Sequence, residues 1–218
     1  MSGDEPTTGI LPGMEAHAGR DLALGQWDTH PELARAFVRW CGVKGAAVIE
    51  PSCGIGNVAV AALGVGGARV VLGVELDPAR ASLARDRRID GFQVVDGDIF
   101  DPVVRQAVPM ADVAIGNPPY EGNGALRHAS RWMEFAPRAC FIAPLETLAG
   151  DREGLWEAKR MHLRRVAVCA PFRPPFGLGG HGMSEIAFFE VVDPAYVAVG
   201  GRIRPTIERL NWRALGKP

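Results

Sequence analysis

The chain has 218 residues, 47% of them hydrophobic and 22% charged, and a net charge of −1 at pH 7. These values are ordinary for one soluble globular domain with a core of its own, and they are not those of a strongly basic nucleic-acid-binding protein. The charge is uneven, because residues 1–120 carry a net charge of −5 and residues 121–218 one of +4. This asymmetry favours a second half that faces a polyanion, with an ordinary solvated surface as the alternative.

The four cysteines, Cys41, Cys53, Cys140 and Cys169, form no C-x-x-C pair. They therefore indicate neither a disulfide framework nor a zinc site. The sequence also has no signal-peptide pattern and no apolar run of about 18 residues. We therefore predict a cytoplasmic protein with reduced thiols, no metal site and no membrane partner.

Residues 1–25 are rich in Gly, Pro, Thr and acidic residues, and they predict a mobile N-terminal arm. A helix is expected to begin at Thr29, because Thr29 and Glu32 have the spacing of a capping box and Pro31 would lie in the first turn. Apolar residues at helical spacing follow, and Gly42 can end the helix.

The next stretch has the pattern of a strand, a glycine turn and a helix. Residues 46–49 are apolar and predict a buried strand, Glu50 ends it, and residues 58–63 predict a helix. Between them lie Gly54 and Gly56. Glycines at such a turn allow the backbone to approach a ligand closely, as in dinucleotide-binding units.

A second strand is predicted at residues 69–74, and Glu75 ends it 21 residues after Gly54. An acidic residue about 20 positions beyond the glycine turn is expected in a nucleotide-binding unit, where its carboxylate can accept the ribose hydroxyl protons. Asp77 then has the position of an N-cap for a helix that runs to about Arg88, so a structural role is favoured for it.

A third strand is predicted at residues 92–95 and a fourth at residues 111–115. Asp96 and Asp98 follow the third strand. In an open α/β sheet, ligands bind at the carboxyl ends of the strands, so these acidic side chains are candidates for a binding site.

The fourth strand leads into Asn117, Pro118, Pro119 and Tyr120. Two prolines fix the backbone and remove two donors, so a stiff loop follows the strand. The side-chain oxygen of Asn117 and the carbonyl of Pro118 could accept hydrogen bonds from the exocyclic amine of adenine, and Tyr120 could offer a face to an unstacked base. An ordinary Asn-Pro turn is the alternative.

The second half of the chain continues the alternation of helices and strands. Helices are predicted at residues 125–135 and 151–162, and strands at residues 140–143, 165–169 and 184–192. In the first of these helices Arg127, His128 and Arg131 lie on the predicted polar side; they are candidates for phosphate contacts or part of a solvated face.

A loop rich in Gly and Pro at residues 172–182 separates the last two predicted strands, and a loop of this kind is often functional. It contains Arg173 and Phe176, which could contact a nucleic-acid backbone and the second face of a flipped base. A surface Arg and a packed Phe are the alternatives. His181 has no partner cluster, so we assign it neither a metal nor a general-base role. Residues 201–218 predict a basic tail.

The motifs on these strand ends, in this order, resemble those of the class I S-adenosylmethionine-dependent methyltransferases. Glu50-Pro51-Ser52-x-Gly54-x-Gly56 and Asn117-Pro118-Pro119-Tyr120 are similar to two motifs of the N6-adenine type. The resemblance covers residues 26–120 motif by motif.

The family implies a Rossmann-like α/β fold, with a mostly parallel seven-stranded sheet, an antiparallel terminal strand and helices on both faces. We accordingly divide the chain into a mobile arm at residues 1–25, a methyltransferase domain at residues 26–200 and a basic C-terminal tail at residues 201–218.

The resemblance also implies a site for S-adenosyl-L-methionine. Asp98 stands where the family has its adenine-binding acid, with Asp96 as the competing choice. Residues 26–29 are similar to the family's aromatic-x-Thr-Pro motif, although His30 separates Thr from Pro; a hydrophobic staple and helix cap are the alternative. The expected cofactor-binding residues are Trp27, Thr29, Glu50, Ser52, Gly54, Gly56, Asn57, Glu75, Leu76, Asp98, Ile99 and Asn117.

For the reaction, the resemblance implies methyl transfer to the N6 amine of adenine in nucleic acid, with Asn117, Pro118, Pro119 and Tyr120 as catalytic residues. The Arg-Pro-x-Phe pattern of residues 173–176 looks like a loop of phage-type DNA adenine methyltransferases, so DNA is favoured. The expected substrate-binding residues are Tyr120, Arg173 and Phe176.

Three alternatives remain open at this point: an RNA adenine methyltransferase, an N5-glutamine methyltransferase of proteins, and a non-catalytic nucleic-acid-binding subunit. The residues after Tyr120 must complete the sheet and leave no room for a separate target-recognition domain. We therefore expect a short recognition site, a partner that supplies specificity, or a homodimer.

Overall fold

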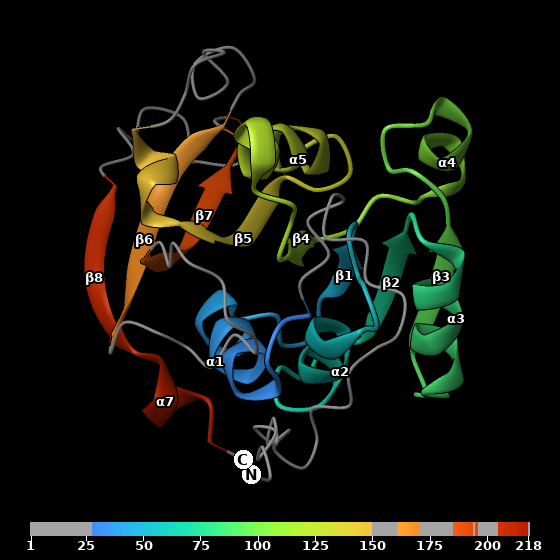
Figure 1. The fold of residues 1–218 in the computed structure, drawn as a ribbon, viewed down its shortest axis with the longest axis horizontal. Helices are drawn as coiled ribbons and strands as arrows, with labels where there is room; N and C mark the ends of the chain where they lie inside the picture. The colour runs from blue at the N-terminus through green and yellow to red at the C-terminus, as the bar shows by residue number, and fades with distance from the viewer. Residues whose placement is uncertain (1–27, 150–160, 171–184, 194, 196–204, 218) are drawn as a thin grey trace, which may run out of the picture.

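One mixed β-sheet organises the part of the chain that the structure, a computed structural model, describes: residues 28–149, 161–170, 185–193, 195 and 205–217 (Figure 1). Its strands are β1 (Ala47–Glu50), β2 (Val70–Glu75), β3 (Phe92–Asp96), β4 (Val113–Gly116), β5 (Arg138–Pro144), β6 (His162–Ala170), β7 (Ile186–Val192) and β8 (Thr206–Asn211). The helices are α1 (Pro31–Cys41), α2 (Asn57–Leu63), α3 (Pro78–Asp86), α4 (Pro102–Ala107), α5 (Gly124–Trp132) and α7 (Trp212–Leu215), with short 3-10 turns at Glu121–Asn123 and Leu145–Leu148.

The strand order in the sheet is β3-β2-β1-β4-β5-β7-β6-β8. Among the described strands only β7 runs against its neighbours; the others are parallel to one another. The chain winds outward from β1 to β3 and then crosses back to β4, so the order reverses between β1 and β4. The carboxyl ends of these two strands flank the crevice where open α/β sheets bind their ligands.

The structure corrects the prediction at the C-terminal end. The sheet has eight described strands instead of the predicted seven, because residues within the predicted tail form β8, which pairs in parallel with β6 at the sheet edge. The antiparallel strand lies where the sequence predicted it, but it is not the last strand. After β8, the fully buried Trp212 of α7 packs against the core, and the Gly216 carbonyl accepts a hydrogen bond from Arg35 at 2.7 Å. Because this segment is rich in basic residues, it was predicted to be a tail, and neither its strand nor its buried Trp was predicted.

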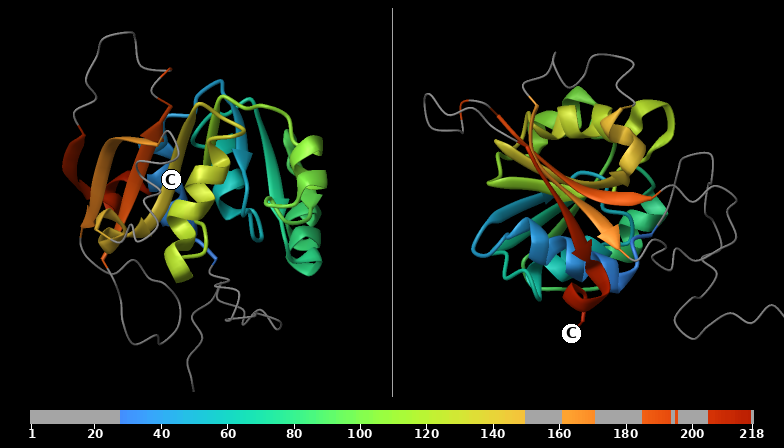
Figure 2. Two further views of the ribbon diagram at one scale, coloured as in Figure 1. Left: turned by 90° about the horizontal axis from the view of Figure 1, so that it is seen from above. Right: turned by 90° about the vertical axis from the view of Figure 1, so that its left-hand side faces the viewer.

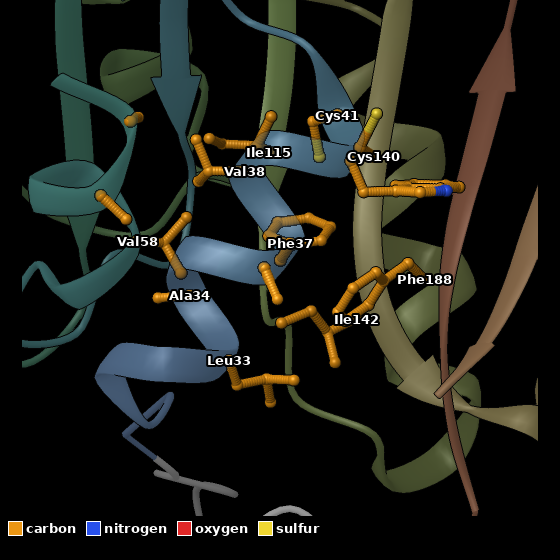
Figure 3. Packing of buried hydrophobic residues seen from close by; sticks show 14 of the residues in the cluster. Leu33, Ala34, Phe37, Val38, Cys41, Val58, Ile115, Cys140, Ile142 and Phe188 are labelled. Atoms are coloured by element: carbon orange, nitrogen blue, oxygen red, sulfur yellow. The ribbon is translucent and has the colours of Figure 1, made fainter. Parts of the chain in front are cut away.

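Helices cover both faces of the sheet, as Figure 2 shows, with α5 on one face and α1, α2 and α7 on the other. On the second of these faces α1 presents a continuous apolar side to the sheet (Figure 3). Leu33 and Phe37 are fully buried there, and the Phe37 ring meets Phe188 of β7 edge-on at 5.1 Å. Burial of large apolar side chains stabilises this layer by about 1.5–3 kcal/mol each.

On the opposite face α5 packs its buried side, Leu126, Ala129 and Trp132, against the sheet. Phe141 of β5 and Phe189 of β7 stack in parallel beneath it, with ring centroids 5.1 Å apart. This cluster holds the helix that follows the Asn-Pro-Pro-Tyr loop in a fixed position over β4 and β5.

Among the helices, α4 was not predicted and α5 ends at Trp132, before the predicted residue 135; two further differences concern the start of α1 and the segment before β6. The N-cap of α1 is His30, whose Nδ1 accepts a hydrogen bond from the Glu32 amide at 3.3 Å, so the prediction of Thr29 as the cap was wrong. His30 precedes Pro31 directly, and the proline occupies the first helical position. The predicted helix at residues 151–162 lies mostly outside the described residues, but His162 already belongs to β6.

A fully buried carboxylate, Glu190 of β7, fixes the C-terminal end of α1. It forms ion pairs with Arg138 at 3.3 Å and Arg164 at 3.2 Å, and a very short one with Arg165. Arg138 also donates to the Cys41 carbonyl at 2.8 Å, and Arg165 donates to the Trp40 carbonyl at 2.7 Å. These guanidinium groups satisfy carbonyls that the helix end leaves without partners, and they complement the helix dipole.

Candidate active site

The carboxyl ends of β1 to β4 open onto one cavity of about 240 Å³. The residues that line it come from the segment before α1, the end of β1 and the turn after it, the start of α2, the ends of β2 and β3, α3, the loop after β4, and α5. The lining residues are Asp28, Thr29, Glu50, Pro51, Ser52, Cys53, Gly54, Ile55, Asn57, Val58, Glu75, Leu76, Arg80, Gly97, Asp98, Ile99, Phe100, Asn117, Pro119 and His128.

Glu75, at the end of β2, links two backbone segments of the cavity wall. Its Oε2 accepts a hydrogen bond from the Gly54 amide at 2.7 Å, and its Oε1 accepts one from the Asp77 amide at 3.0 Å. The side chain is buried, yet each carboxylate oxygen can accept a second hydrogen bond. Glu75 thus orients the glycine turn and keeps acceptor capacity toward the cavity.

Glu50, at the end of β1, is the most deeply buried acidic group of the cavity. It is 2% exposed, and its Oε2 has no hydrogen-bond partner. Burial raises the pKa of Glu50 well above its usual range, and the nearby charge of Glu75 adds to the effect. An unpartnered buried carboxylate is costly, so a cation or donor that entered the cavity would gain a strong interaction here.

Gly54 lies under an ion pair that the sequence did not predict. Its φ is +54°, and a Cβ at this position would come within 2.7 Å of the Arg80 guanidinium. Arg80, from α3, pairs with Asp28 at 2.5 Å, and both side chains are nearly buried. The pair forms one wall of the cavity. No motif marks Arg80, because its place depends on the packing of α3 beside the glycine turn.

Three residues that were expected to bind the cofactor make structural contacts within the protein. One of them does not line the cavity, and the other two line it as well. Gly56 does not line the cavity; its φ is +85°, and its Cα faces the Phe92 ring, where a Cβ would come within 2.8 Å. Asn57 and Thr29 line the cavity, but the Asn57 amide donates to the Thr29 carbonyl at 2.8 Å and accepts from Arg87 at 2.6 Å. Gly56 therefore allows α2 to begin, and Asn57 connects the segment before α1 to the C-terminal end of α3.

The end of β3 separates its two acidic residues. Asp98 lines the cavity, and its Oδ1 accepts a hydrogen bond from the Phe100 amide at 2.8 Å. Asp96 is not among the lining residues and pairs with Arg85 of α3. Of the two candidates, only Asp98 is thus placed to meet a ligand. Two partly exposed apolar side chains, Leu76 and Phe100, also line the cavity, as does the buried Ile99.

The four residues of the Asn-Pro-Pro-Tyr loop differ in whether they line the cavity. Asn117 and Pro119 line the cavity, whereas Pro118 is buried and Tyr120 is not among the lining residues. The Tyr120 ring packs against the apolar cluster beneath α5, and its hydroxyl donates a very short hydrogen bond to Asn117 Oδ1. In this structure the Tyr120 ring lies outside the lining of this cavity, and its predicted contact with a target base stays a prediction.

His128 of α5 is a cavity residue that the sequence placed on the polar side of its helix. It is half-buried, its Nδ1 lies 3.2 Å from Ser52 Oγ, and its ring meets Phe100 edge-on at 4.9 Å. Burial lowers the pKa of His128 to about 4, so the ring is neutral at pH 7. Its position four residues before the buried Trp132 is the signal that could have revealed its inward direction.

The neighbouring Arg131 stacks over the Phe100 ring at 5.3 Å and pairs with Glu134 at 2.9 Å. Trp27, Arg173, Phe176 and His181 lie outside the described residues, so their predicted roles stay predictions.

No helix in the described ranges is long and apolar enough to span a membrane. Within the same ranges no three His, Cys, Asp or Glu side chains are grouped as a metal ion would require.

No known family model matches the sequence. Solved structures with the same fold include a proposed RNA methyltransferase from Pyrococcus horikoshii (TM-score 0.64, 16% identity, covering 81% of this chain and 91% of that chain). A proposed class I S-adenosylmethionine-dependent methyltransferase from Listeria monocytogenes is also similar (TM-score 0.65, 14% identity, covering 92% and 70%). So is TYW2 from M. jannaschii, solved in complex with AdoMet (TM-score 0.54, 13% identity, covering 79% and 80%). At these identities the likeness shows the fold, which is the Rossmann-like α/β fold of these methyltransferases.

Proposed function

We propose that the protein is an S-adenosylmethionine-dependent methyltransferase that acts on the N6 amine of adenine in nucleic acid, with DNA as the favoured substrate. The observation that carries the proposal is the convergence of Glu50, Glu75, Asp98 and Asn117 on one cavity at the strand ends. These residues come from four different strands, and the motifs in which they stand resemble one family.

The donor set of the cavity suits each part of S-adenosylmethionine. The unpartnered Oε2 of Glu50 suits the ammonium group, and the remaining acceptor capacity of Glu75 suits the ribose hydroxyls. Asp98 can accept from the adenine amino group, with Leu76 and Phe100 as apolar surfaces for the ring. When bound, the cofactor supplies an activated methyl group on a sulfonium.

Asn117 is the residue that we propose to meet the target amine. The lone pair of an exocyclic amine is delocalised into the base, so hydrogen-bond acceptors on its protons favour a tetrahedral, more nucleophilic nitrogen. The Asn117 side-chain oxygen and the Pro118 carbonyl would supply these acceptors. Catalysis would then rest on positioning in a near-attack arrangement, without a strong general base.

RNA is the second candidate substrate. It is favoured by one observation, namely that the similar Pyrococcus horikoshii structure is of a proposed RNA methyltransferase and is covered over 91% of its length. The phage-like Arg-Pro-x-Phe pattern of residues 173–176 favours DNA instead. A partner or a second copy of the chain would supply sequence specificity in either case.

The test has two stages. Calorimetry with S-adenosylmethionine and S-adenosylhomocysteine should show binding, and an absence of binding would overturn the proposal. Transfer of a tritiated methyl group is then offered in parallel to duplex DNA, single-stranded DNA, RNA and cell protein, and the product is identified by mass. N6-methyladenine supports the proposal, whereas N5-methylglutamine or no transfer with a bound cofactor contradicts it.

A further inference from the structure

We infer that Arg80 binds the carboxylate of the methionine part of the cofactor, a contact that no motif of the sequence indicated. The inference rests on the proposed function and deepens it, since it assumes that S-adenosylmethionine occupies the cavity. Glu50, Glu75 and Asp98 suit the ammonium, ribose and adenine of this cofactor, and all three act as acceptors. The carboxylate of the cofactor needs a donor instead.

The charges around the cavity single out Arg80. The lining includes four acidic residues, Asp28, Glu50, Glu75 and Asp98, so an anionic group that enters is repelled unless a cation compensates. Among the described residues that line the cavity, Arg80 is the only Lys or Arg. The one cation of this lining therefore matches the one anionic group of S-adenosylmethionine.

The Arg80 guanidinium lies directly against the glycine turn. A Cβ on Gly54 would come within 2.7 Å of its Nη2, so the guanidinium occupies space that only a glycine leaves open. The Arg80 side chain is 9% exposed, which places it in the wall of the cavity and not on the outer surface. In nucleotide-binding units of this kind, the backbone of the glycine turn approaches the ligand closely. A cation in contact with this turn is thus within reach of a bound cofactor.

Backbone amides of the glycine turn are the alternative donors for a carboxylate, and three of them already have acceptors within the protein. The Cys53 amide donates to the Val74 carbonyl at 3.0 Å, and the Gly56 amide donates to the Cys53 carbonyl at 2.8 Å. The Gly54 amide donates to the Glu75 carboxylate at 2.7 Å. The turn therefore favours a side chain as the donor for an anionic group.

Arg80 has donors to spare for a second carboxylate. Its Nη2 donates to Asp28 Oδ1 at 2.5 Å, and this is the one hydrogen bond of the Arg80 side chain among the described residues. A guanidinium carries five N–H donors in a planar fork. Asp28 orients this fork from one side, and another edge can donate two parallel hydrogen bonds to a carboxylate.

The experiment compares two ligands by titration calorimetry: S-adenosylhomocysteine and its decarboxylated analogue, which keeps the ammonium group and has hydrogen in place of the carboxylate. The wild-type protein should bind S-adenosylhomocysteine about tenfold more tightly, or better, than the analogue. In Arg80→Met, binding of S-adenosylhomocysteine should weaken about tenfold or more, because a desolvated charge pair is lost. The affinity for the analogue should change by about twofold or less, so the discrimination between the ligands disappears.

Two further comparisons separate this contact from an effect on folding. Arg85→Met is the matched control, because Arg85 lies on the same helix and pairs with Asp96 at the surface. This variant should bind both ligands as the wild type does. Arg80→Met leaves the buried Asp28 without its cation, so the double variant Asp28→Asn/Arg80→Met is also compared with Asp28→Asn. The double variant should again lose affinity for S-adenosylhomocysteine alone.

The pattern of losses decides the outcome. Equal weakening of both ligands by Arg80→Met would show that Arg80 only supports the cavity wall, and it would overturn the inference. Discrimination kept at the wild-type level in Arg80→Met, or in the double variant, would also overturn it. If the wild-type protein binds neither S-adenosylmethionine nor S-adenosylhomocysteine, the proposed function fails and the inference falls with it. The two failures are distinguishable, because the first leaves wild-type binding intact.

Discussion

The carboxylate of Glu75 accepts a hydrogen bond from the backbone amide of Gly54 at 2.7 Å, and this contact joins the end of β2 to the glycine turn after β1. A second backbone amide, that of Asp77, donates to the other oxygen at 3.0 Å. One buried side chain therefore holds two segments of the cavity wall in register. Its replacement should affect the geometry of the cavity as well as any direct contact with a ligand.

Glu75→Gln tests this relationship. The amide NH₂ of Gln would face one of the two backbone donors, so we expect a loss of about 1–3 kcal/mol in the free energy of unfolding. Binding of S-adenosylmethionine should weaken at least tenfold in calorimetry. Asp96→Asn is the matched control, because Asp96 ends the adjacent strand but pairs with the exposed Arg85. If both variants bind equally, Glu75 has no role in the ligand site.

Glu50→Gln should stabilise the ligand-free protein. Burial raises the pKa of Glu50, so the folded state favours the protonated carboxyl, and the stability that Glu50 contributes is lost as the pH rises above the usual carboxyl range. Gln is neutral at every pH, and we expect the melting temperature at pH 8 to rise by a few degrees, on the order of 1 kcal/mol. Scanning calorimetry of both proteins between pH 5 and pH 8 should show the difference growing with pH.

The same substitution should weaken cofactor binding. A ligand ammonium favours the ionised form of Glu50, so binding to the wild type is expected to release a proton. The released proton is measured by titration calorimetry in buffers of different ionisation enthalpy. Glu50→Gln should bind more weakly and release fewer protons. Equal proton release by both proteins would exclude Glu50 as the ammonium partner.

His128 should make the protein acid-sensitive. Burial lowers its pKa from 6.5 to about 4 in the folded state, so between these values the unfolded chain binds a proton that the folded protein does not. The free energy of unfolding is therefore expected to fall as the pH drops from 6.5 to 4. Urea unfolding of wild type and His128→Gln across this range checks the sign, since the variant should lose part of the slope. A steeper slope in the variant would contradict the assignment.

Glu190→Ala should be among the most destabilising substitutions in the described part of the chain. It would leave Arg138 and Arg165 near the core without their carboxylate, and loss of one partner from a buried ion pair costs about 3–5 kcal/mol. Glu134→Ala is the control, because Glu134 pairs with Arg105 and Arg131 at the surface, where such pairs contribute about 1 kcal/mol or less. Chemical denaturation of both variants gives the comparison.

The sequence determined the strands as far as β5 and the helices α1, α2, α3 and α5 among them, though not α4, because apolar runs, Gly and Pro mark these boundaries locally. It also indicated which residues stand at the strand ends, and Glu50, Glu75, Asp98 and Asn117 do lie around one cavity. These positions follow from a general property of parallel sheets, in which the carboxyl ends of neighbouring strands share an edge.

Only the tertiary structure decided where the side chains around those ends point. The pairing of Arg80 with Asp28, the turn of His128 toward Ser52 and the packing of Tyr120 beneath α5 all depend on how distant helices lie on the sheet. The same holds for β8, whose polar sequence becomes a strand because β6 offers it an edge. Local pattern fixes the order of the elements, whereas contacts between residues far apart in the chain fix the chemistry of the cavity.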